Sequence, residues 1–579
     1  MSDHTCLRCL DPEIIVPISR QTTEVFKTGT WSSIRPRFAE KISPCRASCP
    51  IGNNISAAAR AAADGDFDAA LAAFLEESPL PGVCGRVCYH PCQLSCNRME
   101  ADGAVQVRAL ERASSEFGHA APKILSNAGQ NNPVAVVGSG PAGLSCAYHL
   151  ARMGHPVTVY EAADKPGGLL AYGIPEFRLP EVVLEKELSR IWGLGVTLKT
   201  GIRVDPAEME KLAQSHDAIF FAPGADSSQS LNMSGEKLDG VIPGLDFLRR
   251  PLLQHKAKNA EVVVIGGGNT ALDAARLAVR AGARHVTVLY RRTRDEMPGF
   301  TDEVADAEAE GILFKTLVAP ASFLGSQRLE AVRLVRFKLA EPEADGRPRP
   351  IPIEGTEEDM ACDMALIATG QKPSDLFLDS DLRWESGRIW VDTWNRTSQS
   401  KIFSGGDVTP AKASVVDAMA TGKRAALGIH LSAVDRLSDA DVKTVMLGAG
   451  PAFSLTAWFQ RPENWRPDQV AVPDNLTLCM APQQPPENLP ETNTAERVHS
   501  DEEVALGFTI EAAGKEAERC LVCGTCVGCN RCMVFCPEGA VIPPEEPGGE
   551  YLYRNEYCKG CNTCASVCLR GVMEAGEDR

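Results

Sequence analysis

The placement of its cysteines is the feature that most constrains this chain. Eighteen of the 21 cysteines lie in short-spaced clusters near the two ends of the 579-residue sequence, and only Cys146, Cys362 and Cys479 stand alone. Spacings of C-x2-C and C-x3-C are typical of metal clusters, whereas disulfides are rare in proteins of reducing compartments. Both ends are therefore predicted to bind metal, and each isolated cysteine to be a small apolar residue.

The C-terminal cluster begins with six cysteines between positions 520 and 536. The last four form the C-x2-C-x2-C-x3-C-P run of two-cluster bacterial ferredoxins, and a second run, CKGCNTCASVC, follows. In such ferredoxins the fourth cysteine of each run serves the other cube. The predicted ligands of one [4Fe-4S] cube are Cys526, Cys529, Cys532 and Cys568, and those of the other are Cys536, Cys558, Cys561 and Cys564. Cys520 and Cys523 have no place in this scheme.

Two nucleotide-binding units occupy the middle of the chain. The first, from Asn131 to Glu161, reads as strand, glycine turn, helix, strand and acid. Its G-x-G-x-x-G motif allows a tight turn, close approach of the backbone to a pyrophosphate, and close packing of helix on strand. Glu161 ends the second strand, where an acid can hold a ribose hydroxyl. The predicted cofactor-binding residues are Gly138, Gly140, Pro141, Ala142, Gly143 and Glu161.

The second unit runs from Glu261 to Arg292 and ends on arginines instead of an acid. Guanidinium groups at this position can pair with a 2′-phosphate, which favours NADPH over NADH. Asp295 and Glu296 complicate the local charge, so both nucleotides stay open. The predicted cofactor-binding residues are Gly266, Gly268, Asn269, Thr270, Ala271, Arg291 and Arg292.

A third segment completes the first fold. Gly406 and Asp407 follow an apolar strand and precede a helix, where the aspartate can reach the ribityl or phosphate end of a flavin. Strands at Asp217–Ala225 and Asp363–Pro373, the latter with Gly370, indicate that the nicotinamide domain is inserted into the flavin domain. Hydride transfer between NAD(P)H and FAD fits this order, and because the protein then mainly binds and orients cofactors, no catalytic side chain is predicted.

The N-terminal cluster contains PCRASCP, with Cys45 and Cys49, and GVCGRVCYHPCQLSC, with four more cysteines. A zinc site uses one quartet of ligands, whereas six cysteines joined to a flavin fold favour [4Fe-4S] cubes. Neither nucleotide fingerprint carries the C-x2-C or C-x4-C pair of a disulfide reductase. We therefore expect electrons to leave the flavin through the N-terminal domain.

These motifs, together with VGSGPAGLSCAYHL, GGLLAYGIPEFRLP, VIGGGNTALDAAR and YRRTRDEMP, resemble the small subunit of glutamate synthase. They are also similar to the N-terminal half of dihydropyrimidine dehydrogenase and to the large subunit of the electron-bifurcating transhydrogenase. The resemblance runs from about Pro44 to His430. It implies an NAD(P)H-oxidising FAD protein with two cubes in a helical N-terminal domain, and it adds Gly168 and Leu169 to the residues expected at the flavin.

The same resemblance implies the ligands of the two N-terminal cubes. One set falls on Cys49, Cys88, Cys92 and Glu111, with Glu111 in place of a family glutamine and with a solvated helix glutamate as the alternative. The other set retains Cys45 and Cys96, but Arg37 and Glu40 stand where the family has two further cysteines.

Two cysteine pairs elsewhere could complete the second set. The segment EAERCLVC, with Cys520 and Cys523, reads like the missing family element, and we hypothesise that the chain returns to supply it. Cys6 and Cys9 are the alternative pair. A protein with three cubes and spare thiols, rather than four cubes, is the third interpretation.

The expected fold class is multidomain α/β with two Rossmann-like domains. The predicted divisions are a helical iron–sulfur domain over 1–125, an FAD domain over 126–255 and 371–435, an NAD(P) domain over 256–370, an extended linker over 436–515 and a ferredoxin-like domain over 516–579.

The predicted function is a reversible NAD(P)H:acceptor oxidoreductase that exchanges single electrons with a protein partner, such as a ferredoxin or a larger reductase. The chain also resembles the iron–sulfur flavoprotein that is paired with dissimilatory sulfite reductase in sulfur oxidisers. One alternative is an electron-input subunit docked permanently on a larger enzyme of the glutamate synthase type. Another is a non-catalytic redox sensor, against which the two intact nucleotide sites argue.

Composition excludes other kinds of partner. A net charge of −17 argues against nucleic acid and anionic membranes. No apolar run reaches the roughly 18 residues of a spanning helix, and no secretory pattern opens the sequence. We expect a cytoplasmic protein, and a homodimer is left open.

Overall fold

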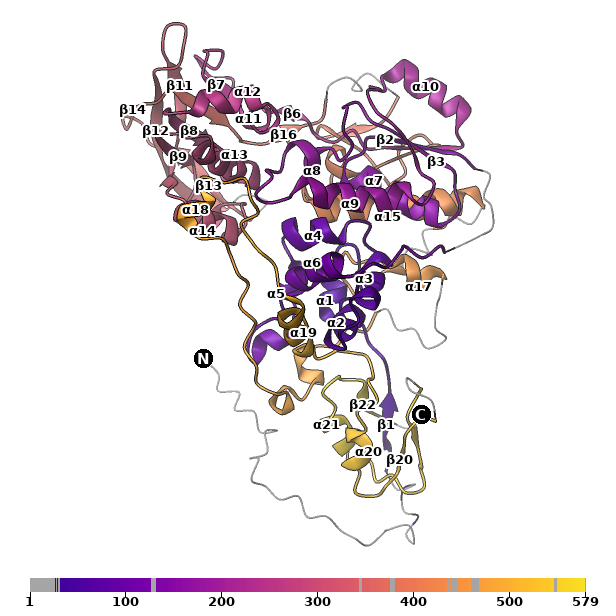
Figure 1. The fold of residues 1–579 in the computed structure, drawn as a ribbon. Coiled ribbons are helices and arrows are strands. Elements are labelled where there is room, and N and C mark those ends of the chain that lie inside the picture. The colour runs from indigo at the N-terminus through magenta and orange to yellow at the C-terminus, as the bar shows by residue number, and fades with distance from the viewer. Residues whose placement is uncertain are drawn as a thin grey trace.

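The computed structural model describes residues 27, 29, 32–125, 132–342, 346–374, 381–434, 438, 445–459, 468–545 and 549–577. Two nucleotide-binding domains lie side by side at one end, a helical domain lies below them, and the C-terminal cysteine domain lies at the far end (Figure 1). Within the described ranges, no helix is long and apolar enough to cross a membrane. Cys6 and Cys9 lie outside the described residues.

The helical domain is built from short helices, and its cysteines lie in or next to α1, α4 and α5. Its helices are α1 (Pro44–Ser48), α2 (Ile55–Ala63), α3 (Phe67–Leu75), α4 (Pro81–Val87), α5 (Pro91–Leu94) and α6 (Val107–Phe117). The side chains of Asn54 and Asp66 cap α2 and α3 by accepting backbone N–H bonds. Alanines fill the buried face of α2, which lets neighbouring helices approach closely.

The first nucleotide-binding domain has a parallel sheet of order β19-β5-β2-β3-β4. Its strands are β2 (Val134–Val137), β3 (Val157–Tyr160), β4 (Thr197–Lys199), β5 (Ala218–Phe221) and β19 (Ile402–Ser404), and its helices are α7 (Pro141–Arg152), α8 (Leu169–Tyr172), α9 (Glu181–Trp192), α10 (Pro206–Ser215) and α15 (Val415–Ala433). Because β19 and α15 come from beyond the second domain, that domain is inserted, as predicted.

The second nucleotide-binding domain has a parallel sheet of order β10-β9-β8-β15-β7. Its strands are β7 (Val241–Pro243), β8 (Glu261–Ile265), β9 (His285–Tyr290), β10 (Leu313–Thr316) and β15 (Met364–Ile367), and its helices are α11 (Gly244–Arg249), α12 (Pro251–Gln254), α13 (Asn269–Arg280) and α14 (Thr301–Ala309). An antiparallel sheet covers it, with β11 (Val318–Leu324), β12 (Ala331–Pro342), β13 (Pro348–Pro352) and β14 (Glu358–Ala361).

The inserted domain starts earlier than the boundary predicted at residue 256. Strand β7 forms the edge of its sheet, and β6 (Ser227–Ser228) pairs with β16 (Gln371–Lys372) where the chain enters and leaves. A three-residue strand followed by the single glycine Gly244 has no G-x-G-x-x-G motif, so the sequence predicted the start of the domain at its fingerprint instead. A small hairpin of β17 (Trp384–Glu385) and β18 (Arg388–Ile389) follows in the first domain.

The C-terminal domain takes one of its strands from the N-terminal part of the chain. Strand β1 (Ile34–Phe38) pairs antiparallel with β22 (Met573–Glu577). The Lys41 amide donates to the Gly524 carbonyl at 2.8 Å, and the Lys41 ammonium donates to the Gly571 carbonyl at 2.6 Å. The predicted separation of 1–125 from 516–579 is therefore not sharp. The domain also holds α20 (Arg531–Val534), β20 (Val541–Ile542), β21 (Leu552–Tyr553) and α21 (Thr563–Ser566).

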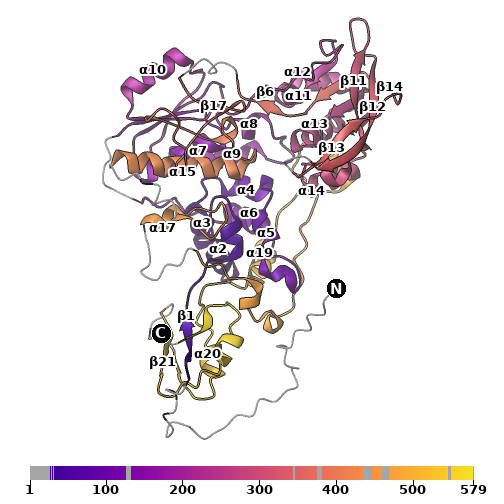
Figure 2. The same cartoon turned by 180° about the vertical axis from the view of Figure 1, so that it is seen from behind.

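Residues 468–509, which we call the strap, run across the molecule. Figures 1 and 2 show the strap rising from the helical domain to α14 and returning to α19 (Ile510–Glu518). Near its start, the Asn97 side chain donates to the Ala471 carbonyl at 2.9 Å. At its top, α18 (Thr494–Arg497) lies on the inserted domain, and the Val504 amide donates to the Phe177 carbonyl at 3.0 Å. Part of the region predicted as a linker thus contacts three domains.

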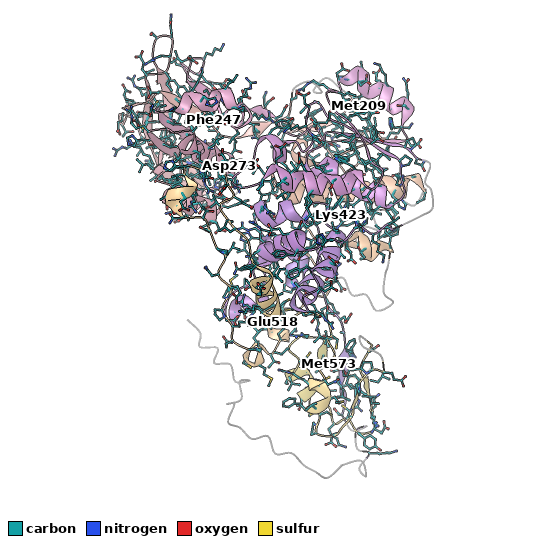
Figure 3. All side chains as sticks on the ribbon, in the orientation of Figure 1. Met209, Phe247, Asp273, Lys423, Glu518 and Met573 are labelled. Carbon is teal, nitrogen blue, oxygen red and sulfur yellow. The ribbon has the colours of Figure 1, made fainter. Side chains whose placement is uncertain are left out.

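A buried ion pair joins the helical domain to the FAD domain. Lys423 of α15 pairs with Glu77, and both side chains are fully buried. The Lys423 ammonium also donates to the carbonyls of Ile51 at 2.6 Å and Phe453 at 2.7 Å. Figure 3 shows Lys423 at the boundary of the two domains. Because every partner is buried, this contact fixes their relative position. Phe453 precedes α17 (Leu455–Phe459).

Arg497 of the strap enters a buried ion network of the inserted domain. Its guanidinium lies 3.1 Å from a carboxylate oxygen of Asp306 and 3.1 Å from one of Glu310. Arg276 and Arg280 also pair with Glu310, whose side chain is fully buried.

We expect Arg497→Met to weaken the attachment of the strap to the inserted domain by about 1.5–3 kcal/mol, because the buried carboxylates of that domain lose one charged partner. The readouts are the midpoint of urea unfolding and the rate of limited proteolysis within 468–509. The matched control is Arg284→Met, since the Arg284 side chain is 63% exposed and its ion pair with Glu261 is long, at 3.8 Å. Equal effects of the two substitutions would refute the prediction.

Candidate cofactor sites

Both nucleotide fingerprints line one large cavity of about 1220 Å³ between the two nucleotide-binding domains. Twelve of the residues predicted to bind cofactors line this cavity: Gly138, Gly140, Pro141, Ala142, Glu161, Gly168, Leu169, Gly268, Asn269, Thr270, Gly406 and Asp407. The remaining predicted nucleotide-binding residues lie outside the lining: Gly143, Gly266, Ala271, Arg291, Arg292 and Gly370. Figure 3 shows Asp273, another lining residue, on the side of the inserted domain that faces the FAD domain.

The glycines of the first fingerprint have separate structural roles. Gly138 has φ +96°, a conformation that side chains rarely adopt. A Cβ at Gly143 would lie 1.9 Å from the Gly138 carbonyl oxygen, so only glycine lets α7 pack there. A Cβ at Gly140 would meet nothing within 4 Å. Open space at the start of α7 fits a pyrophosphate drawn to the helix N-terminus.

Glu161 orders the turn of this fingerprint. One carboxylate oxygen accepts from the Ser139 amide at 2.9 Å and the Ser139 hydroxyl at 2.6 Å, and the other accepts from the Ala163 amide at 2.8 Å. Sequence reasoning missed Ser139, because the fingerprint leaves that position unspecified. Both glutamate oxygens are thus fixed at the edge of the cavity.

The second half of the FAD domain adds Gly406 and Asp407. The Gly406 amide, at φ +71°, donates to the Thr421 hydroxyl at 2.8 Å, which ties this turn to α15. Burial raises the pKa of Asp407, and the nearby Arg388 opposes the rise. Both residues line the same cavity as the first glycine turn, and a Cβ at Gly406 would lie 3.1 Å from the Cβ of Ala142, so the two turns adjoin.

The glycines of the second fingerprint divide in the same way into one that is closely packed and one that is open. Gly266 has φ +140°, and a Cβ there would lie 2.2 Å from the Ala368 carbonyl oxygen. Gly268 has no atom nearer than 3.9 Å to such a Cβ, so its backbone is open to a phosphate. The Asn269 side chain accepts from the Phe300 amide at 2.9 Å, which fixes the loop after β9 on the fingerprint.

The two arginines after β9 differ in their surroundings. Arg292 is buried, and its Nε donates to the Pro348 carbonyl at 2.8 Å, so it supports the covering sheet. Arg291 is exposed. Spacing from the fingerprint could not distinguish the two arginines, because the strand that covers Arg292 comes from a distant part of the sequence.

The first N-terminal ligand set is brought together around Glu111. Cys49, Cys88 and Cys92 are buried, and the Glu111 carboxylate acts on the pKa of all three. Burial raises the pKa of Glu111 to about 8, and the Asn53 side-chain amide donates to it at 3.1 Å. Glu111 is thus not a solvated helix residue. Cys84 also lies in this group.

The second set joins both ends of the chain. Burial and the charge of Cys520 raise the pKa of Cys45, with Cys96 and Cys523 adding to the rise. Burial, with the charges of Cys520 and Cys96, raises the pKa of Cys523 to about 12. The structure therefore places the Cys520–Cys523 pair beside Cys45 and Cys96.

Arg37 and Glu40, which stand where the family has cysteines, form hydrogen bonds instead. Arg37 donates to the Glu577 carbonyl, and the Glu40 carboxylate accepts from the Cys526 amide at 3.3 Å. Both residues therefore contact the C-terminal domain.

The C-terminal thiols fall into two groups. Burial raises the pKa of Cys532 to about 12, and Cys568, Cys529 and Cys526 add to the rise. In the other group, burial raises the pKa of Cys564 to about 11, and Cys536, Cys558 and Cys561 add to that rise. Each group contains the fourth cysteine of the other run, which fits the predicted exchange.

The donor sets fit [4Fe-4S] cubes. Four irons stand between the ligands of a cube, so its thiolates lie farther apart than around one ion. Within the described part of the chain, no group of three or more His, Cys, Asp or Glu residues is arranged for a single metal ion. Backbone amides donate to the sulfurs of Cys88 at 3.3 Å, Cys520 at 3.4 Å and Cys536 at 3.4 Å, as amides around cluster sulfurs do.

The two glycines of the first fingerprint give a matched test. We expect Gly140→Ala to leave stability within about 0.5 kcal/mol, since its methyl enters open space. The same methyl should lower FAD affinity at least about tenfold, because it occupies the approach of the pyrophosphate. Gly143→Ala should instead destabilise the domain by about 1–3 kcal/mol or more, because the methyl overlaps a carbonyl oxygen. Flavin absorbance per chain and thermal unfolding separate the two, and a Gly140→Ala protein with full flavin would contradict the assignment.

Three family models match separate parts of the chain. Residues 132–422 match the pyridine nucleotide-disulphide oxidoreductase model, residues 39–121 match dihydropyrimidine dehydrogenase domain II with its 4Fe-4S cluster, and residues 525–572 match the 4Fe-4S dicluster domain. These matches confirm the predicted fold class and the predicted cofactors, namely FAD, NAD(P)H and [4Fe-4S] clusters.

Curated relatives extend over most of the sequence. NADP(+)-dependent formate dehydrogenase subunit beta of Moorella thermoacetica is 36% identical over 516 residues, which cover 83% of this chain and 70% of that protein. NADPH-Fe(3+) oxidoreductase subunit beta of Geobacter sulfurreducens is 36% identical over 519 residues, which cover 84% and 76%. The glutamate synthase [NADPH] small chain of Escherichia coli is 34% identical over 415 residues, which cover 66% and 87%. The chain is thus an oxidoreductase of the pyridine nucleotide-disulphide oxidoreductase family, similar to glutamate synthase small chains and with 4Fe-4S domains on both sides of its nucleotide-binding domains.

Proposed function

We propose that the chain is an NADPH:acceptor oxidoreductase in which four [4Fe-4S] clusters connect FAD to a protein partner. The observation that carries this proposal is the position of Cys520 and Cys523 beside Cys45 and Cys96. This juxtaposition supplies four thiols to a site to which the described residues of the N-terminal domain contribute two. The names of the three relatives above all include NADP(H), which supports NADPH as the electron donor.

Neighbouring ligand sets share short segments of chain, so the proposed clusters follow one another in space. Cys45 in α1 and Cys49 at its C-cap belong to different sets, and so do Cys92 in α5 and Cys96 just after that helix. Only two residues separate Cys523 from Cys526. Figure 3 shows Glu518, just before this segment, between the helical and C-terminal domains. The order supported is first N-terminal set, second N-terminal set, and then the two C-terminal cubes.

The cavity adjoins the first ligand set, because Val87 and Tyr89 on either side of Cys88 both line it. The chemistry that bound FAD would supply is acceptance of a hydride from NADPH and one-electron transfer to [4Fe-4S] clusters. The two glycine turns hold the dinucleotides, and Glu161 and Asn269 fix those turns. The buried Lys423–Glu77 pair keeps the flavin domain against the first ligand set.

The proposed partner is a redox protein or a larger enzyme that receives electrons at the C-terminal domain. Two of the three relatives are named as beta subunits and the third as a small chain, which favours a docked electron-input subunit as the second candidate. Dissimilatory sulfite reductase is the specific partner suggested by the sequence resemblance. We further propose a cytoplasmic location, where free thiols and clusters persist. Size-exclusion chromatography of the purified chain tests for a homodimer.

Iron content tests the proposal directly. Anaerobically purified protein should contain about 16 irons per FAD, and Cys520→Ser/Cys523→Ser should contain about 12, because one of four cubes is lost. Cys362→Ala, at a buried cysteine of the inserted domain, is the control and should keep about 16. A double variant with all its iron would show that Cys520 and Cys523 are not ligands.

Arg291 provides a test of nucleotide choice. We expect Arg291→Ala to raise KM for NADPH about tenfold and to leave KM for NADH within about twofold, because a charge-assisted bond to the 2′-phosphate is lost. Arg294→Ala is the matched control, since Arg294 is half exposed and already paired with Glu308 at 2.7 Å. Initial rates of flavin reduction give both constants, and equal changes for NADPH and NADH would contradict the assignment.

A further inference from the structure

Tyr89 lies where three domains meet inside the nucleotide cavity. It follows Cys88 in the loop between α4 and α5 of the helical domain. Its ring centroid lies 6.3 Å from that of Phe300 in the inserted domain, with 35° between the ring planes. The Lys412 ammonium, from the segment before α15 of the FAD domain, lies 3.6 Å from the Tyr89 centroid. All three side chains line the cavity.

Phe300 is rigidly connected to the second fingerprint. Its amide donates to the Asn269 side chain at 2.9 Å, and the Gly299 amide donates to the Gly267 carbonyl at 2.9 Å. A movement of the fingerprint therefore carries the Phe300 ring with it. Contact between Tyr89 and Phe300 consequently depends on the position of the inserted domain.

The other side of Tyr89 is fixed to the FAD domain. The Asp417 carboxylate, in the first turn of α15, lies next to the Tyr89 hydroxyl. The Ser414 hydroxyl donates to the same carboxylate at 2.5 Å. The Tyr89 ring is thus held by Lys412 of the FAD domain and also contacts Phe300 of the inserted domain.

We propose that Tyr89 is a positioning residue that holds the inserted domain in the arrangement needed for hydride transfer. The inference rests on the proposed transfer from NADPH to FAD. Reacting atoms must approach to about 3–3.5 Å, so a small displacement of one domain is enough to slow the reaction. The aromatic contact with Phe300 favours this position of the inserted domain, and the cation–π contact with Lys412 holds the Tyr89 ring on the FAD domain. Neither contact requires Tyr89 to exchange an electron or a proton.

Anaerobic stopped-flow reduction of the flavin by NADPH tests this role in the full-length protein. We expect Tyr89→Ala to lower the limiting rate of flavin reduction about tenfold while the Kd for NADP+ stays within about twofold. Tyr89→Phe should restore most of that rate, because it keeps the ring under Lys412 and against Phe300. Iron content should match the wild type in both variants, which excludes loss of the adjacent cluster.

A double-mutant cycle separates positioning from general damage. Phe300→Ala should slow flavin reduction to a similar extent, and Tyr89→Ala/Phe300→Ala should be no slower than either single variant, because all three lack the same contact. Additive losses, an unchanged limiting rate in Tyr89→Ala, or a loss confined to NADP+ affinity would each overturn the inference. If NADPH fails to reduce the wild-type flavin, the proposed function itself fails, which is a distinct result.

Discussion

The hydrogen bonds of one buried arginine hold the two iron–sulfur regions together, and the arrangement of the ligand sets depends on them. Arg519, fully buried at the end of α19, donates to the carbonyls of Ala104 at 3.0 Å, Gly103 at 2.7 Å and Gln484 at 2.8 Å. It also pairs with Glu516 at 2.6 Å. Arg519 is the residue before Cys520, so these bonds set where that thiol lies. A buried charge is tolerated only when it is so fully partnered, and any shift of the segment would leave it unpaired.

Local patterns were sufficient to predict the nucleotide folds and the C-terminal cubes. The roles of the fingerprint glycines depend on backbone geometry within a few residues, and the structure gives Gly138, Gly140 and Gly143 the expected turn, open space and close packing. The exchange of fourth cysteines in the C-terminal domain likewise follows from spacing alone. In these regions the sequence contains its own structural context, because the interacting groups are near neighbours in the chain.

Features that depend on distant partners could not be predicted in this way. Arg292 was predicted to bind a nucleotide phosphate, but it is buried against Pro348 of a sheet that follows much later in the chain. Strand β1 gives no sign in sequence that it completes the sheet of the C-terminal domain. The return of Cys520 and Cys523 was predicted only because a familiar motif was missing from one place and present in another. Without that clue, spacing alone could not choose their neighbours.

The joining of the chain's two cysteine-rich regions also constrains how the protein is made. A site built from Cys45, Cys96, Cys520 and Cys523 cannot exist on the ribosome until the segment after α19 has emerged. The same holds for the sheet that β1 forms with β22. The nucleotide-binding domains can fold earlier, because their strands and helices lie between these regions. The proposed second cluster of the helical domain would therefore be inserted late, after Cys520 and Cys523 have been synthesised.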